Sequence, residues 1–235
     1  YNIYIPHDEP KRALEIVQEQ LVQVAKALGN QDNVPFIYYN TIGDGEALSE
    51  LEVNQFCQGL HCQLLNHYEK GDESLTLQAL YNHCERHDDR VIYLHSKGSY
   101  HDNKVNAAWR RALTLAALHP DCWNPPESSC NVCGLQFFTM FTFFWPGNMW
   151  AADCSYVRKL IPPREYAQRH EEAVTRFLLL RLSGYMKSQL LRDRRDYFGL
   201  DRYNAEHWIG SHPDLQPCDM HPAGSLKSVF LRKTG

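Results

Sequence analysis

Residues His95-Ser96-Lys97-Gly98-Ser99 combine a cation, hydroxyl donors and a flexible backbone in five consecutive positions. They follow residues 91–94, Val-Ile-Tyr-Leu, a short apolar run typical of a buried strand. Open α/β sheets bind their ligands beyond the carboxyl ends of their strands. Donors of this kind suit an anionic oxygen, and a phosphate group is its simplest source. The motif therefore predicts a phosphate site that uses His95, Ser96, Lys97 and Ser99.

Alternating strands and helices must position this motif. The pattern predicts strands at 2–6, 34–40, about 62–66 and 91–94, and helices at 11–28 and 71–87. Such alternation indicates an α/β fold with a mostly parallel central sheet flanked by helices. Right-handed crossovers would bring the loops after the first, second and last strands to one edge. We therefore expect His7 and Asp44 to lie beside Lys97.

The second half of the chain is less regular. Its pattern predicts helices at 106–118, 151–160 and 171–182, an aromatic strand at 137–144, and an aromatic turn at 145–150. Proline residues 162 and 163 are expected to end the second of these helices. No repeat or interdomain linker is visible, and one domain is the simplest organisation for 235 residues.

Composition excludes several classes of protein. A hydrophobic fraction of 43% and a charged fraction of 22% are ordinary for a soluble globular chain. The net charge of -4 argues against a nucleic-acid partner. The longest apolar stretch, 137–145, is too short for a membrane span. Because the chain begins at Tyr1, it reads as an excised domain: the compartment is the cytoplasm, or the lumen of the secretory pathway if an anchor was removed. The sequence does not indicate an oligomeric state.

Eight cysteines are more than a typical cytosolic domain carries. Cys130 and Cys133, with Cys122 nearby, have half of a zinc-ribbon spacing, but no second Cys-x-x-Cys occurs. We therefore expect buried free thiols or one loop disulfide, ahead of a structural zinc site.

Several further pieces follow the motif along the chain. Trp109-Arg110 lies in a predicted helix, and the aromatic turn contains Asn148. Glu171-Glu172 opens a predicted helix, where carboxylates also favour the positive end of the helix dipole. The late segment 201–213 is dense in polar and aromatic residues, and it packs on the sheet or supplies Glu206 or His207 to a site.

In this order, these pieces resemble the rhamnan synthesis protein F-like glycosyltransferases and their polysaccharide-synthesis relatives. Those proteins show a strand ending in Leu-His-(Ser/Thr)-Lys, a Trp-Arg helix, an aromatic turn with Gly-x-Met, and a Glu-containing helix. The similarity spans residues 90–182. The layout also looks like the GT-A glycosyltransferase fold. It implies a single glycosyltransferase domain over 1–235, with a nucleotide-sugar half at 1–105 and an acceptor half at 106–235.

The resemblance implies a role for each piece. The donor is a UDP-, GDP- or dTDP-sugar and the acceptor is a glycan, free or linked to protein. A carboxylate takes the proton of the acceptor hydroxyl, and the candidates are Glu172, Glu171 and then Glu206. The nucleotide-sugar is expected to contact His7, Asp44, His95, Ser96, Lys97 and Ser99. The acceptor is expected to contact Trp109, Arg110, Asn148, Met149, Trp150 and His207. Trp145 and Trp150 offer faces for stacking on sugar rings.

Metal use is the main departure from the family pattern. Many GT-A enzymes hold a divalent metal with Asp-x-Asp, and this chain has no such motif. Asp88-Asp89 precedes its strand and so lies at the wrong edge, whereas Asp102 follows the strand and remains a possible ligand. Lys97 and His95 are expected to replace part of the metal's charge.

Two other classes of function compete with the transferase. A non-catalytic carbohydrate-binding or scaffold domain would keep the aromatic turn without needing Lys97 and Glu172. A phosphate-handling hydrolase is disfavoured, because the sequence lacks its nucleophile and metal motifs.

Overall fold

The protein is α/β in a computed structural model that describes residues 1–28, 35–45, 55, 57, 59–99, 103–126, 130–139, 142–181, 189, 192, 195–220 and 226–228. The strands are β1 (Asn2–Ile5), β2 (Phe36–Gly43), β3 (His61–Tyr68), β4 (Arg90–Tyr93), β5 (Val132–Leu135), β6 (Trp150–Asp153), β7 (Pro217–Met220) and β8 (Leu226–Ser228). The helices are α1 (Pro10–Leu28), α3 (Ser74–Cys84), α4 (Lys104–Ala117), α5 (Pro120–Trp123), α6 (Cys154–Val157), α7 (Pro163–Arg181) and α9 (Asn204–Trp208). None of the helices described is long and apolar enough to cross a membrane.

The strands form a parallel sheet and a mixed sheet that meet at one point. The first has the order β1-β2-β3, and the second has the order β4-β6-β5-β7-β8 with β6 antiparallel to both neighbours. A parallel bridge between Asn2 and His95 connects β1 with the chain just after β4. In it, the Asn2 amide donates to the Leu94 carbonyl (2.9 Å), and the Ser96 amide donates to the Asn2 carbonyl (3.0 Å).

Strand order reverses at this junction. The chain moves outward from β1 to β2 and β3, then returns through α3 to β4 on the other side of β1. Such a reversal leaves a crevice beyond the carboxyl ends of the two central strands, where α/β proteins bind ligands. The motif at 95–99 follows β4 and lies at this crevice. Its predicted place at a sheet edge is therefore confirmed.

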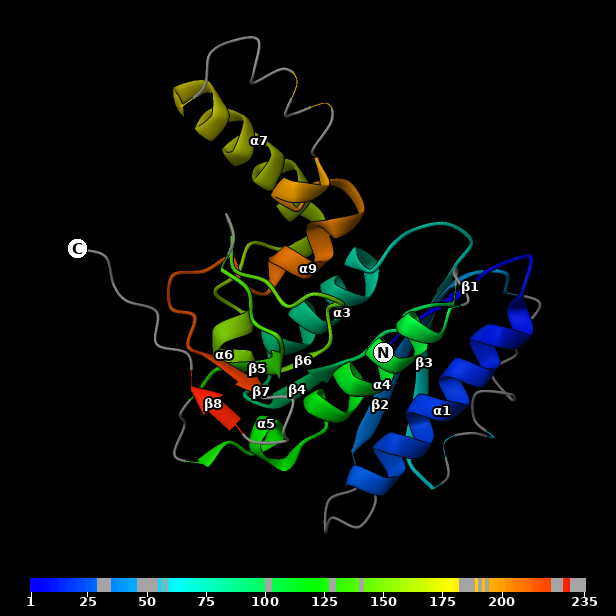
Figure 1. Ribbon diagram of the computed structural model, residues 1–235. Helices are drawn as coiled ribbons and strands as arrows, with labels where there is room; N and C mark the ends of the chain where they lie inside the picture. The colour runs from blue at the N-terminus through cyan, green and yellow to red at the C-terminus, as the bar shows by residue number, and fades with distance from the viewer. Residues whose placement is uncertain are drawn as a thin grey trace.

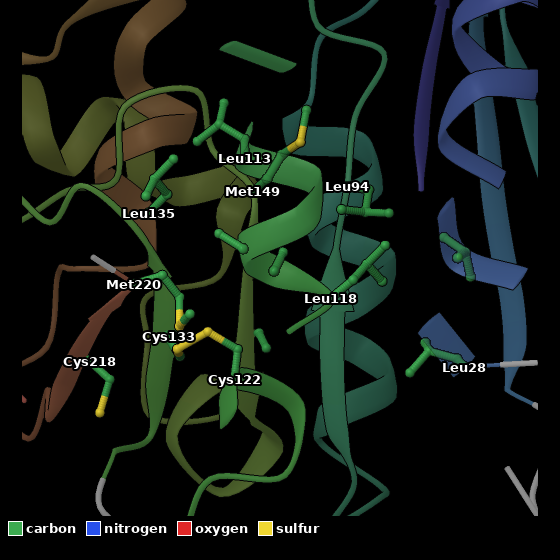
Figure 2. Close-up of a cluster of buried hydrophobic side chains, with 14 of the residues drawn as sticks. Leu28, Leu94, Leu113, Leu118, Cys122, Cys133, Leu135, Met149, Cys218 and Met220 are labelled. Carbon is green, nitrogen blue, oxygen red and sulfur yellow. A yellow bond between two sulfur atoms is a disulfide. The ribbon is translucent and has the colours of Figure 1, made fainter. Parts of the chain in front are cut away.

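Hydrophobic cores fill both faces of the mixed sheet, because successive strand residues point to opposite sides. Ala151 packs with α1 and α4 on one face, while Trp150 and Ala152 pack with α3 on the other. Figure 1 shows α1 and α4 side by side, and α7 extending away from the sheets. Figure 2 shows Leu113 of α4 close to Met149 within the first of these cores.

All eight cysteines form disulfides, so the expectation of free thiols or a single loop disulfide was wrong. The pairs are Cys57–Cys62, Cys84–Cys154, Cys122–Cys133 and Cys130–Cys218. Figure 2 shows the Cys122–Cys133 bond inside the core. The Cys-x-x-Cys spacing does not mark a metal site here. Cys133 of β5 bonds Cys122 of α5, whereas Cys130 bonds Cys218 of β7. These two thiols therefore belong to different bridges, and neither is available to zinc.

The predicted elements of the first half are confirmed, whereas three of the second half need correction. The expected aromatic strand 137–144 is described as only a single bridge, between Phe138 and Phe144. The expected helix 151–160 is the strand β6 followed by one helical turn, α6. Ala151 and Ala152 are fully buried between two neighbouring strands, so tertiary pairing overrides their helix preference.

The third correction concerns α7. This helix begins at Pro163, whose fixed φ suits the first position of a helix, and not at residue 171. Glu171 and Glu172 consequently lie in its middle, and they do not open a helix as predicted. Glu206, by contrast, lies in the first turn of α9.

Candidate functional site

A tight turn at Pro146-Gly147 forms the centre of the site. The Asn148 amide donates to the Trp145 carbonyl (3.0 Å), and Gly147 has φ +85°, as a type II turn requires at its third residue. A Cβ on Gly147 would lie 2.5 Å from Leu113 Cδ1, so any other residue there would have to displace the buried Leu113 side chain. The turn therefore fixes a backbone segment against the motif that follows β4.

Asn148 continues the turn and links it to Glu73. It is fully buried with φ +46°, a conformation that non-glycine residues adopt rarely. Its Nδ2 donates to Glu73 Oε2 (2.7 Å), and its Oδ1 accepts from Trp150 Nε1 (2.8 Å). Because an indole N–H only donates, this contact sets the orientation of the amide. Strained residues of this kind cluster at functional sites.

Glu73 and His95 form the polar core of the site. His95 Nδ1 lies 3.3 Å from Glu73 Oε1, and His95 Nε2 lies 2.7 Å from the Gly147 carbonyl oxygen. Because that carbonyl only accepts, His95 Nε2 carries a hydrogen. Burial lowers the pKa of His95, and the negative charge of Glu73 opposes this effect. The ring and the carboxylate are therefore held close together in a place largely shielded from solvent.

Tyr93 completes the surroundings of Glu73. Its hydroxyl donates to Glu73 Oε2 (3.1 Å), so that oxygen receives two hydrogen bonds. Burial, followed by the charge of Glu73, raises the pKa of Tyr93 well above its ordinary value. The hydroxyl thus stays a donor, and the orientation of the carboxylate is set from three sides.

A cavity of about 500 Å³ opens beside this cluster, at the carboxyl ends of β1 and β4. Its volume is in the range of small-molecule sites. Acidic and basic side chains share its wall, and its lining includes Glu73, His95, Lys97, Ser99, Arg164 and Arg202. Of the six residues predicted to hold a nucleotide-sugar, His95, Ser96, Lys97 and Ser99 line it.

Ser96 and Arg110 hold the motif in place. Ser96 Oγ accepts from the Tyr4 amide (2.8 Å), so this buried hydroxyl ties the motif to β1. Arg110 Nη1 donates to the Lys97 carbonyl (3.0 Å), while its Nε donates to Glu19 (3.2 Å). Arg110 is buried, and it was predicted to contact the acceptor. The structure instead places it beneath the backbone of Lys97.

Glu206 is the carboxylate that the structure brings to Lys97. Burial raises the pKa of Glu206, and the positive charge of Lys97 and a hydrogen bond from the Gly147 backbone oppose that rise. The Gly147 backbone thus bonds Glu206 directly and is connected to Glu73 through His95. A raised pKa makes a carboxylate a stronger proton acceptor than a free one.

Glu171 and Glu172 lie apart from this cavity. Glu171 accepts from Arg195 Nη1 (2.9 Å), and Glu172 accepts from Gln168 Nε2 (2.9 Å), both on exposed parts of α7. His7 and Asp44 follow β1 and β2 and face each other at 3.5 Å, as their shared edge predicts. Neither of these two residues lines the cavity with Lys97.

Most of the predicted acceptor residues are packed inside the protein. Trp145, Met149 and Trp150 are fully buried, and Trp109 packs against the core of α1 and α4. His207 is 4% exposed, and its Nδ1 bonds Thr142. Burial, with His170 nearby, lowers the pKa of His207 to about 3. Asn148 touches the site only through Glu73.

Metal ligands are not grouped in the part of the chain that the structure describes. Within it, no group of three or more His, Cys, Asp or Glu residues is arranged to hold an ion. Asp102, the predicted ligand, lies outside the described residues. Asp88 pairs with Arg158, and Asp89 pairs with His83 (2.8 Å). Both aspartates precede β4 and so lie at the opposite end of this strand from Lys97, as the sequence predicts.

The sequence interpretation missed Glu73, Tyr93, Arg164 and Arg202. Glu73 belongs to Gly71-Asp72-Glu73, a segment typical of a helix start, and its backbone does precede α3. No spacing connects it with His95, since the two residues meet only when α3 returns the chain to β4. Arg164 lies in the first turn of α7 and lines the cavity, whereas the sequence predicted that this helix begins at residue 171.

Comparison with known proteins gives one relationship. Residues 1–232 match the family described as Domain of unknown function (DUF8361). No curated protein and no solved structure matches the chain.

Proposed function

The chain belongs to the DUF8361 family, whose function is unknown, and we propose that it is a glycosyltransferase that uses a nucleotide-sugar donor and a glycan acceptor. The observation that carries the proposal is a cation and a carboxylate at the reversal of strand order: Lys97 lines the cavity there, and Glu206 is near enough for the charge of Lys97 to lower its pKa. Glycosyl transfer needs a cation for the leaving diphosphate and a base for the acceptor hydroxyl. The GT-A-like layout implied by the sequence resemblance agrees with this position of the cavity.

The donor diphosphate is assigned to the cationic part of the wall. Lys97, Arg164 and Arg202 line the same cavity, and their positive charges would stabilise the negative charge that develops on the leaving group. These side chains supply charge of the kind that a divalent metal supplies in related enzymes. We therefore expect donor binding to depend on Lys97 and to need little or no metal.

Glu206 is proposed as the base, in place of Glu171 and Glu172. The acceptor oxygen attacks the anomeric carbon while its proton passes to the Glu206 carboxylate. The bond from that carbon to the diphosphate breaks, and its electron pair leaves on the diphosphate oxygen. Such a direct displacement inverts the anomeric centre. The reaction balances without any further reagent.

Glu73 and His95 are proposed as positioning residues. His95 holds the Gly147 carbonyl, and the Gly147 backbone in turn bonds Glu206. Glu73 orients His95 and is itself held by Asn148 and Tyr93. A change at Glu73 would therefore act on the rate through the place of Glu206.

The four disulfides favour an oxidising compartment. Disulfides form and persist in oxidising surroundings, and they are rare in the reducing cytosol. Of the two compartments that the sequence leaves open, we propose the lumen of the secretory pathway.

A thermal-shift experiment tests the transferase proposal. Oxidised protein is heated with UDP-, GDP-, dTDP- and CDP-sugars, with and without manganese. At least one nucleotide-sugar is expected to raise the melting temperature of the wild type, and Lys97→Ala is expected to abolish that rise. Glu172→Gln is the control, because it lies away from the cavity. If no nucleotide stabilises the wild type, the transferase proposal fails, and the carbohydrate-binding scaffold takes its place.

A further inference from the structure

Strand β1 is shorter than the two strands that flank it. Its residue Asn2 pairs with Asn40 of β2 on one side and bridges to His95, just after β4, on the other. β2 begins earlier, at Phe36, and β4 begins at Arg90. Both strands run parallel to β1. Since neighbouring strands lie about 4.8 Å apart, the amino-terminal halves of β2 and β4 are separated by the width of one further strand.

A groove of about 1320 Å³ occupies this gap, and we call it the strand slot. Its lining includes residues 36–38 of β2, residues 90–93 of β4, and parts of the helices α1 and α3. Tyr39 packs on α1, whereas its neighbour Asn40 bonds Thr76 of α3 (3.1 Å), so the two helices lie on opposite faces. The strand slot therefore has a strand at each side and a helix on each face.

Backbone groups of both flanking strands point into the strand slot. Successive residues of a strand direct their N–H and C=O groups to opposite sides, and alternate residues to the same side. The Tyr38 carbonyl accepts from the amino end of the chain (2.7 Å), so Tyr38 and Phe36 face the slot. The Leu94 carbonyl accepts from the Asn2 amide (2.9 Å), so Leu94 and Ile92 face it from the other side.

The inward-facing backbone groups are open. In the part of the chain that the structure describes, no hydrogen-bond partner is recorded for the Phe36 C=O, the Tyr38 N–H, the Leu94 N–H, or the N–H and C=O of Ile92. Asp89, one residue out of phase with these, bonds the other way: its carbonyl accepts from the Cys154 amide (2.9 Å) at β6. Open groups of this kind pair with a further strand, and extended peptides bind sheets in this way.

The two faces of the strand slot differ in chemistry. Along β1, Ile3 packs on α1, whereas the Asn2 side chain accepts from Thr76 of α3 (2.7 Å). Apolar residues of α1 line the first face of the slot. Asn40 and Thr76 line the second, and Asn40 Oδ1 is buried there without a partner among the described residues. A strand in line with β1 would need apolar side chains toward α1 and polar side chains toward α3.

We propose that the strand slot binds an extended peptide of a partner protein, which adds as a strand parallel to β2 and β4 and ends beside Tyr1. Donors and acceptors alternate on two facing walls at the strand repeat, a pattern that an extended backbone matches on both sides. One register satisfies both faces, because a shift by one residue exchanges the side chains between them. The slot lies at the opposite ends of the strands from the Lys97 cavity, and the proposal does not depend on the transferase.

Calorimetric titration with synthetic peptides tests the proposal. The probe is acetyl-Lys-Lys-Ile-Thr-Val-Ser-amide, whose serine would lie beside Tyr1 and whose valine and isoleucine would face α1. The control, acetyl-Lys-Lys-Thr-Ile-Ser-Val-amide, has the same composition with its alternation shifted by one residue. The probe is expected to bind about tenfold more tightly than this control. N-methylation of its valine removes the donor to the Phe36 carbonyl and should weaken binding by about as much.

Two protein variants and hydrogen exchange locate the binding. Ala79 of α3 is half-buried and lines the strand slot, so Ala79→Trp should block the probe. Ala107→Trp is the matched control, because Ala107 is a half-buried alanine on α4 that does not line the slot. It should bind the probe like the wild type. In the wild type, the probe should slow exchange of the Tyr38, Ile92 and Leu94 amides.

Several outcomes would overturn the proposal. One is the absence of binding, or binding that the shifted or N-methylated peptide matches. Another is binding that Lys97→Ala removes, since the peptide would then occupy the other cavity. A dimer of the wild type that the probe dissociates would assign the slot to a second copy of the chain. If the same four residues stabilise the protein only when joined to Tyr1, the slot belongs to a strand of the same polypeptide. Nucleotides enter none of these experiments, so failure here is distinct from failure of the transferase proposal.

Discussion

Glu73 and His95 face each other at 3.3 Å, although one residue precedes α3 and the other follows β4. The contact exists because β4 returns to the side of β1, which places the start of α3 beside the end of β4. From His95 the network passes through the Gly147 carbonyl (2.7 Å) to the backbone beside Glu206. A substitution at Glu73 should therefore change the pKa of His95 directly. It should affect Glu206 only through His95 and Gly147.

Glu73→Gln is expected to lower the pKa of His95. The negative charge of Glu73 raises that pKa against the larger effect of burial, and glutamine removes the charge while keeping the shape. The titration of the His95 Cε1–H signal by NMR measures the change. Glu172→Gln, which removes an exposed carboxylate on α7, is the matched control and should not shift the signal. An unchanged or higher pKa in Glu73→Gln would contradict the assigned contact.

Gly147→Ala should destabilise the protein more than Gly59→Ala. Both glycines have positive φ, +85° and +86°, so alanine costs roughly 1–2 kcal/mol at either position. At Gly147 the new Cβ also meets Leu113 Cδ1 at 2.5 Å, whereas nothing lies within 4 Å at Gly59. Overpacking of this kind adds about 1–3 kcal/mol. Urea unfolding measures the free energy of unfolding of both variants. Equal losses would show that the contact of the added Cβ with Leu113 costs nothing further.

Loss of the Cys84–Cys154 disulfide should cost about 4 kcal/mol, and loss of Cys57–Cys62 about 2 kcal/mol. The first bond closes a loop of 70 residues and the second a loop of 5, so the first restricts the unfolded chain more. Paired Cys→Ala variants and denaturant unfolding give the two values. A thiol assay on unreduced, denatured protein is the accompanying check. Titration of two or more free thiols per chain would contradict the four bridges.

Stability should fall as the pH drops below about 6.5. The pKa of His207 is lowered from 6.5 to about 3 by burial, so the unfolded chain binds a proton at pH values where the folded chain does not. The stability from this difference is complete above pH 6.5 and declines toward pH 3. Between pH 7 and 5 the loss from His207 amounts to about 2 kcal/mol. Burial lowers the pKa values of His170 and His95 as well, which adds to the same trend.

Unfolding experiments at pH 7 and pH 5 test this trend. The variant His207→Gln cannot take up a proton, so its loss of stability between the two pH values should be smaller than that of the wild type. The comparison uses differences between pH values, so the packing lost in the variant cancels. An equal pH dependence in both proteins would place the sensitive group elsewhere.

Local patterns predicted the first half of the fold well. Helical spacing of apolar residues and the Pro10 start identified α1, and the apolar run before His95 identified β4. The carboxyl-edge rule then placed His95 and Lys97 correctly, because parallel strands end at a common edge. The same rule brought His7 to Asp44, but it overestimated the width of the site, since this pair lies outside the cavity of Lys97.

Tertiary contacts decided what the patterns missed. Residues 151 and 152 favour a helix by type, yet they are held in the central strand β6 by neighbours on both sides. Trp150 looks like a sugar platform in the sequence, but its ring is buried and its N–H serves Asn148. Glu73 had no signal at all, because its partner is reached only through the return of the chain to β1. Among the three candidate bases, the carboxylate that interacts with Lys97 is Glu206, which was the last of the three.

The role of Glu206 is best tested by the hydrolysis of a sugar nucleotide, in which water replaces the unknown acceptor, its proton passes to Glu206, and nucleoside diphosphate is released. The wild type is incubated with the nucleotide-sugar that stabilises it best, over a range of pH. Release is expected to rise with pH through the raised pKa of Glu206, to fall at least 100-fold in Glu206→Gln, and to stay unchanged in Glu172→Gln. Full activity in Glu206→Gln, or loss of activity in Glu172→Gln, would show that Glu206 is not the base.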